Sequence, residues 1–109
     1  MLKMEIELDS KIIDKLGYNS EKLFEFLPTL FEKAGFIKEK AENGYFLYRG
    51  PGLNTDLAYM GIVANGLVEQ DWVKMSCKKW LLLSDIKSED GSFHIEGDWI
   101  KDYKDLKRW

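Results

Sequence analysis

The sequence predicts an α+β domain, a mostly antiparallel sheet of about four to five strands with helices on one face. Two observations favour this class. Short apolar or alternating runs flank the turn signals Asn43-Gly44 and Asp90-Gly91, which are typical of β-hairpins. Two longer stretches, 20–34 and 56–64, follow residues that commonly cap helices. With 109 residues the chain has the size of one domain, and we expect a single α+β domain over residues 1–109.

The N-terminal third is expected to form a strand and two helices. Residues 2–8 alternate apolar with charged side chains, as a half-buried strand does. A short helix should start at Asp9 or Ser10, and a longer amphipathic helix should span 20–34. Pro28 removes one N–H group from the longer helix, which predicts a kink or two short helices.

The middle of the chain is expected to add a hairpin, a helix and a strand. Residues 36–41 and 45–49 should pair around Asn43-Gly44. Residues 56–64 predict a helix that Asn65-Gly66 ends. Residues 72–77 alternate, which predicts a further strand.

A second hairpin should close the core. Its first strand holds Trp80, and a type I′ turn at Asp90-Gly91 would place Ile86 opposite Ile95. Asp98 should then cap a helix over 99–108. Without its small elements the order reads βαββαβ, so a ferredoxin-like arrangement is the first topology prediction.

The charge balance argues against a general nucleic-acid surface. Sixteen Lys and Arg stand against 19 Asp and Glu, giving a net charge of -3 and a pI of about 5.2. Nucleic-acid binders usually carry a basic face. A single cysteine, Cys77, excludes an internal disulfide and is typical of a reducing compartment. No signal peptide or transmembrane run is visible, so we expect a cytoplasmic protein with no membrane partner.

No catalytic motif is visible, and we expect a non-enzymatic protein without a cofactor. The one histidine, His94, lies in a predicted strand with Glu96 pointing away from it. Cys77 is the one candidate thiol nucleophile, and it shares a predicted strand face with Val73 and Met75, which favours a buried, inert thiol. A Cys77–His94 pair in space stays an open alternative.

No metal site is expected either. Carboxylates around the last hairpin offer oxygen ligands for Ca²⁺ or Mg²⁺, but they lack the spacing of a calcium-binding loop. A solvated acidic tip explains them better. These carboxylates are Asp85, Glu89, Asp90, Glu96 and Asp98.

The order of elements at the N-terminus resembles that of ribbon-helix-helix repressors. A strand (residues 4–8), a short helix (9–16) and a longer helix (20–34) follow one another over about a third of the chain. The resemblance implies that outward strand residues would enter the major groove of DNA, and here these are Lys3, Glu5 and Glu7. Phosphates would repel two carboxylates, so nucleic acid is not the expected partner.

The surplus of tryptophan suggests an interface. The chain has four Trp, and Trp72 and Trp99 stand beside the acidic residues Asp71 and Asp98. Together with Tyr103 they are the candidate interface residues, because aromatic side chains next to charge make good anchors. The alternative is that all four Trp fill the core.

Two acidic segments support the same function. Residues 50–73 contain no Lys or Arg, and residues 87–98 hold four carboxylates against one lysine. We therefore expect a small protein-binding module, similar in kind to inhibitor, immunity or antitoxin-like proteins, that occludes a partner with a basic surface.

Two other function classes stay open. A small-molecule or enzymatic site would use Arg49, His94 and Tyr48 as its polar groups. A nucleic-acid regulator would depend on the basic residues of the last segment, which are Lys101, Lys104, Lys107 and Arg108. A homodimer formed by edge-strand pairing is compatible with every one of these functions.

Overall fold

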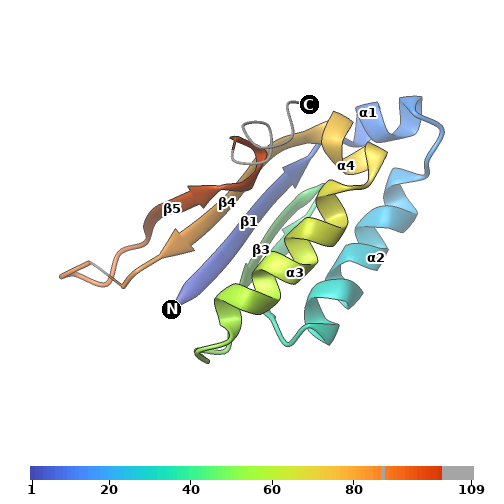
Figure 1. The fold of residues 1–109 in the computed structure, drawn as a ribbon. Helices are drawn as coiled ribbons and strands as arrows, with labels where there is room; N and C mark the ends of the chain where they lie inside the picture. Colours follow the sequence, from blue (N-terminus) through green and yellow to red (C-terminus); the bar gives the residue numbers. More distant parts are fainter. Residues whose placement is uncertain (87, 102–109) are drawn as a thin grey trace.

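β1 (Leu2–Leu8) is the central strand of a five-stranded antiparallel sheet with the order β2-β3-β1-β4-β5. The computed structural model describes residues 1–86 and 88–101, and these form one α+β domain (Figure 1). The elements that follow β1 are α1 (Ser10–Lys15), α2 (Ser20–Lys33), β2 (Ile37–Glu42), β3 (Tyr45–Arg49), α3 (Asp56–Val68), α4 (Asp71–Ser76), β4 (Cys77–Ser84) and β5 (His94–Asp98).

The predicted class is confirmed, but the ferredoxin-like topology is wrong. A ferredoxin-like sheet has four strands, whereas here β5 adds to β4 as an outer strand. Each of the two predicted crossover helices is also a pair of helices, α1 with α2 and α3 with α4. Element order alone does not specify how many strands the sheet contains or where it ends.

Alternation along the strands divides the sheet into two faces. On β1 the side chains of Met4, Ile6 and Leu8 are buried under the helices. Cross-strand partners continue this inner face, with Ile6 opposite Phe46 on β3 and Trp80 on β4. Figure 1 shows α2 and α3 side by side over that face, with α1 and α4 at one end of the sheet.

The other side, the outer sheet face, bears no described helix. It is formed by the side chains that alternate with the buried ones on β1, β3, β4 and β5. Its residues are Lys3, Glu5, Glu7, Tyr45, Leu47, Arg49, Lys79, Leu81, Leu83 and Ile95.

Predicted caps and the first turn are confirmed. Asp9 accepts a hydrogen bond from the N–H of Lys11, and Asn19 accepts one from that of Lys22. Asn43 and Gly44 have φ values of 49° and 87°, as a type I′ turn requires. A Cβ on Gly44 would lie 2.5 Å from the carbonyl oxygen of Leu8, so the turn also needs glycine for space.

Two predicted boundaries are wrong, and so is one of the two alternatives at Pro28. α2 is one helix that continues through Pro28, which excludes two short helices. α3 runs through Asn65-Gly66 to Val68, because its buried side chains continue past that signal. Residues 71–76 form α4 and not a strand, and β4 begins only at Cys77. In a segment of six residues the apolar pattern fits both the two-residue period of a strand and the 3.6-residue period of a helix, so tertiary packing decides which of them forms.

The second hairpin is confirmed as an antiparallel pair, but its register is wrong. Ser84 lies opposite His94 and Leu83 opposite Ile95, so Ile86 is not opposite Ile95. Gly91 has a φ of 78°, whereas Asp90 does not have a positive φ, which rules out the type I′ turn. The connection is therefore a longer loop. Within residues 1–86 and 88–101, no helix has the length and apolarity needed to cross a membrane.

Candidate functional site

The helix layer covers only part of the inner sheet face. α2 packs over β2 and β3, where Phe31 contacts the rings of Phe46 and Tyr48, and α3 lies over β1. Strands are about 4.8 Å apart and packed helices about 10 Å apart, so β4 and β5 extend roughly one helix width beyond α3. Figure 1 shows these two strands projecting past α3.

Two neighbouring cavities lie in this gap. One has a volume of about 500 Å³ and the other of about 330 Å³. They share Leu57 of α3, Leu82 of β4 and Glu96 of β5, so we treat them as one trough that runs along β4. The trough is lined by Met1, Leu2, Gly52, Leu53, Asn54, Asp56, Leu57, Gly61, Leu82, Ser84, Ile86, Glu96, Gly97, Asp98 and Trp99.

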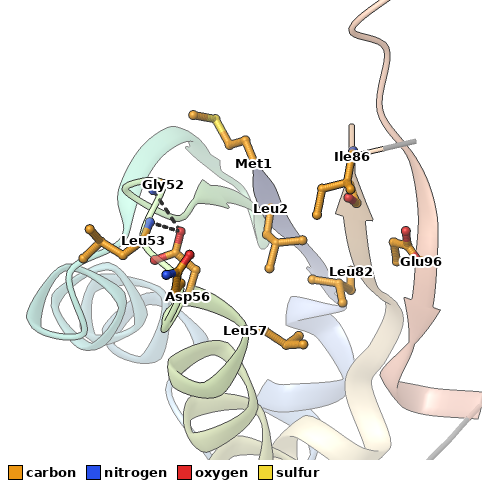
Figure 2. Close-up of a pocket in the computed structure, with 11 residues that line it drawn as sticks. Met1, Leu2, Gly52, Leu53, Asp56, Leu57, Leu82, Ile86 and Glu96 are labelled. Carbon is orange, nitrogen blue, oxygen red and sulfur yellow. Dashed lines mark hydrogen bonds between the residues drawn. The ribbon is translucent and has the colours of Figure 1, made fainter. Parts of the chain in front are cut away.

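Asp56 fixes the wall of the trough that α3 provides. Its buried carboxylate accepts hydrogen bonds from the backbone N–H groups of Gly52 and Leu53 at 2.9 and 3.1 Å. These bonds hold the loop against the first turn of α3, where a carboxylate is also favoured by the helix dipole. Figure 2 shows Leu57, the next residue, extending from α3 toward Leu82.

A β-bulge sets the opposite wall. Leu82 pairs with Gly97 and Leu83 with Ile95, so Glu96 has no partner residue on β4. Bulges re-aim side chains in this way. Glu96 lines the trough and lies 2.9 Å from Nε2 of His94. The expectation that Glu96 points away from His94 is wrong, since residues two apart on a strand share a face.

The trough is apolar at its floor and acidic along β5. Glu96 and Asp98 contribute carboxylates there, whereas the carboxylate of Asp56 is buried and bonded to backbone N–H groups. None of the described lining residues is Lys or Arg. Asp98 also accepts hydrogen bonds from the N–H groups of Ile100 and Lys101, which confirms its predicted capping role. At one end the N-terminal amine contacts Asp85 at 2.6 Å, and this contact lowers the pKa of the Asp85 carboxyl.

The predicted aromatic interface does not form one surface. Trp72 is 5% exposed in α4, so it is not an exposed strand residue as predicted. Trp99 is partly buried at the end of the trough, and its ring centroid lies 5.8 Å from that of Trp80. Asp71 is exposed in the first turn of α4. Tyr103 lies outside the described residues.

Trp72 instead helps to line a second cavity of about 530 Å³, between α2 and α3 on their outer side. We call it the α2–α3 groove. Because α3 separates this groove from the trough, Trp72 and Trp99 lie on different sides of the helix. The groove is lined by Leu23, Phe26, Leu30, Ile62, Val63, Gly66, Leu67, Gln70 and Trp72.

The alternative ligand residues do not converge. Tyr48 is fully buried on the inner face, whereas its neighbour Arg49 belongs to the outer sheet face. His94 lies on β5, about 14 Å from β3 at ordinary strand spacing. Burial raises the pKa of the Tyr48 hydroxyl, so it stays protonated at neutral pH. This geometry gives no shared polar site.

The Cys77–His94 alternative is also wrong in space. Cys77 begins β4 and His94 pairs with Ser84 at its end, so about 23 Å of strand separates them. Cys77 is half-buried, and its Sγ lies 3.4 Å from the carbonyl oxygen of Lys79. Val73 is buried and Met75 is 62% exposed, so the predicted shared face does not exist. Among the described residues no His, Cys, Asp and Glu cluster has metal-site geometry.

The ribbon-helix-helix resemblance does not extend to the sheet. β1 pairs with strands of its own chain on both sides, so β1 itself has no free edge for pairing with a second copy. Lys3 and Glu5 also form ion pairs with Glu39 and Lys79. Of the four basic residues in the last segment, only Lys101 lies within the described part of the chain.

The predicted acidic segments meet only in part. α3 from the first segment and β5 from the second form the two walls of the trough. Glu69 and Asp71 lie at the far end of α3, away from Glu96 and Asp98. The apolar lining residues Leu2, Leu57 and Leu82 were not singled out from the sequence. The sequence feature that could have indicated this surface is the absence of charged residues in α3 between Asp56 and Glu69, because a helix without charge is expected to have both of its sides covered.

Comparison of the chain with protein-family models, with curated proteins and with solved structures found no match.

Proposed function

We propose that this chain is a non-catalytic protein-binding module that acts by occluding a segment of a partner, as inhibitor, immunity or antitoxin-like accessory proteins do. The observation that carries the proposal is the trough, with an apolar floor between α3 and β5 and carboxylates along β5. The proposed occupant is a basic amphipathic helix of another protein.

The width of the trough supports a helix. The inner face of β4 and β5 extends about one helix diameter beyond α3, the space that a third packed helix would need. The floor residues Leu2, Leu57 and Leu82 would receive its apolar stripe. Such helix-in-groove binding uses apolar anchors at i, i+3, i+4 and i+7.

The charge along β5 supports a basic partner. Glu96 and Asp98 line the β5 side of the apolar floor, and no described Lys or Arg lines it. Lysines beside the apolar stripe of the partner helix would meet these carboxylates, which raises the association rate and disfavours acidic partners. Binding should therefore weaken as salt rises.

The first experiment uses defined peptides as probes. An amphipathic leucine-lysine peptide of about 18 residues has the stripe and charge that the trough fits, and its leucine-glutamate counterpart has the wrong charge. We expect micromolar binding of the lysine peptide by titration calorimetry and no binding of the glutamate peptide. Leu57→Gln and Glu96→Gln should each weaken lysine-peptide binding by about fivefold or more.

Matched substitutions outside the trough control for general effects. Met75→Gln changes an exposed apolar residue of α4, and Glu25→Gln removes an exposed carboxylate of α2. Both should bind the lysine peptide as the unmodified chain does. Equal binding of both peptides, or equal affinity of the Leu57→Gln, Glu96→Gln and control variants, would show that the trough is not the binding site.

A further inference from the structure

The exposed side of α3 is a second apolar surface, and no described element of the chain covers it. The helix carries no charged residue between Asp56 and Glu69. Tyr59 is 49% and Ile62 is 66% exposed, whereas Met60 between them in the sequence is fully buried. A helix that is apolar all round is normally covered on all sides. This side of α3 is not covered by any described element.

The α2–α3 groove lies beside these residues. Ile62 and Gly66 of α3 line it together with Phe26 and Leu30 of α2, and Phe26 is 49% exposed. The groove has a volume of about 530 Å³ and none of its lining residues is charged. It is separate from the trough, which Leu57 and Gly61 line on the other side of the helix.

Two glycines inside α3 add an independent observation. Glycine in a helix interior lowers helix stability relative to alanine. A Cβ at Gly61 or at Gly66 would meet no atom within 4 Å, so packing inside the chain does not require glycine at either position. Glycine on an exposed helix face lets a second backbone approach closely. At Gly66 that approach would take place at the α2–α3 groove.

We propose that this surface binds a second copy of the chain, with α3 of one copy packed against α3 of the other about a two-fold axis near Ile62. A two-fold interface brings a surface patch onto itself, so any charge in the patch would face its own sign. The patch of Phe26, Tyr59, Ile62 and Gly66 is uncharged and avoids this repulsion. It offers nothing to the basic partner proposed for the trough, whose recognition depends on carboxylates.

The size of the patch predicts a weak dimer. Its three large side chains, Phe26, Tyr59 and Ile62, expose on the order of 300 Å² together. A standard interface buries about 800 Å² per partner, so we expect a weak, reversible dimer. The dimer leaves the trough free, and the two surfaces can be tested separately.

Charge substitutions at one position test the two-fold arrangement. In sedimentation equilibrium from about 5 to 500 μM, the full chain should show reversible dimerisation. Ile62→Lys and Ile62→Glu should each weaken it at least about tenfold, and an equimolar mixture should restore it, because the two charges then face each other. Ile95→Lys, at an equally exposed position on the sheet, should dimerise like the unmodified chain.

Several results would overturn the dimer. These are a monomer across the whole concentration range, a mixture of the two Ile62 variants that stays monomeric, or loss of the dimer in Ile95→Lys. In contrast, both Ile62 variants should bind the lysine peptide normally. A failure of the trough proposal would therefore not be mistaken for a failure of this one.

The glycines provide a second test in which folding and association change in opposite directions. Gly66→Ala should raise the thermal midpoint of the monomer by about 4 °C, because alanine favours the helix. It should also weaken dimerisation at least about fivefold, because the added methyl group separates the backbones. Gly61→Ala, on the trough side of the same helix, should raise the midpoint equally and leave dimerisation unchanged. Equal dimerisation of the two alanine variants would contradict the proposal.

Discussion

The outer sheet face and the exposed side of α3 are both uncovered, yet they are built differently. On the sheet, Lys3 lies 2.7 Å from Glu39, and Glu5 contacts both Lys79 at 3.6 Å and the hydroxyl of Tyr45. Lys3 also lies 4.2 Å from the ring centroid of Phe93. On α3, by contrast, the exposed side chains from Leu57 to Ile62 are all uncharged.

The difference separates a surface rich in paired charges from an apolar one, and the apolar one is the surface that we propose binds a second copy. On the sheet, long charged side chains pair with one another beside half-buried leucines, and the exposed apolar residue of this face is Ile95 on the outer strand. Such a face is stable in solution. The α3 surface has no such charges, and its apolar area would gain from being removed from water. The bare face of a sheet is thus not the better candidate for a partner here.

The largest expected effect tests which side of the helix layer stabilises the fold. Phe31 of α2 is fully buried, with its ring centroid 4.8 Å from that of Tyr48, whereas Phe26 is 49% exposed. Phe31→Ala should lower the free energy of unfolding by about 3–5 kcal/mol and Phe26→Ala by less than about 1 kcal/mol, measured by urea unfolding. A similar loss in both variants would mean that the α2–α3 groove belongs to the core.

The next effect concerns pH and the outer sheet face. Burial and the neighbouring Glu5 raise the pKa of Tyr45 from 10.0 to about 12. The unfolded chain therefore loses this proton first, so the stabilisation is complete below pH 10 and disappears as the pH rises through about 12. Solvent screening limits its size to about 1 kcal/mol.

Urea unfolding at several alkaline pH values checks this. Tyr45→Phe should lose less stability between pH 10 and about 12 than the unmodified chain does. Tyr18→Phe, which removes a hydroxyl outside the sheet, is the matched control. Identical pH profiles for Tyr45→Phe and the unmodified chain would show that this contact does not stabilise the sheet face.

A smaller effect is expected from the ion pair beside it. A double-mutant cycle with Glu5→Gln and Lys79→Met should give a coupling energy of about 0.5 kcal/mol, because Lys79 is largely exposed. The coupling should vanish in about 1 M NaCl. A coupling that persists at high salt would indicate a contact that is not primarily electrostatic.

The smallest effect on stability is expected at the most exposed apolar residue of α3. Ile62→Glu should change the free energy of unfolding of the dilute monomer by less than about 0.5 kcal/mol. This residue then contributes to association without contributing to folding, the reverse of Phe31. A loss of several kcal/mol in urea unfolding would show that Ile62 already packs within its own chain.

Local signals predicted much of the fold correctly. The strand over 2–8, the capping by Asp9, Asn19 and Asp98, and the type I′ turn at Asn43-Gly44 were all readable from neighbouring residues. Each depends on interactions within a few positions along the chain.

The errors concern residues whose environment is set by distant parts of the chain. Trp72 lies in a six-residue segment that fits a strand or a helix equally well, and in the folded chain it is helical and buried. A bulge shifts the register between β4 and β5, and no turn residue in the sequence predicts this bulge. The trough combines residues from β1, α3, β4 and β5, so no single segment could have revealed it.

The α+β class, most element positions and the absence of charge along α3 follow from composition and local periodicity, so they can be predicted from the residues alone. Three features depend on how the whole chain packs: β1 is central, β5 extends the sheet beyond α3, and one side of α3 borders a trough and the other a groove. The physical reason is that an apolar helix can be buried in many arrangements of similar local energy. Only the packing of the whole chain fixes which of its sides remain exposed.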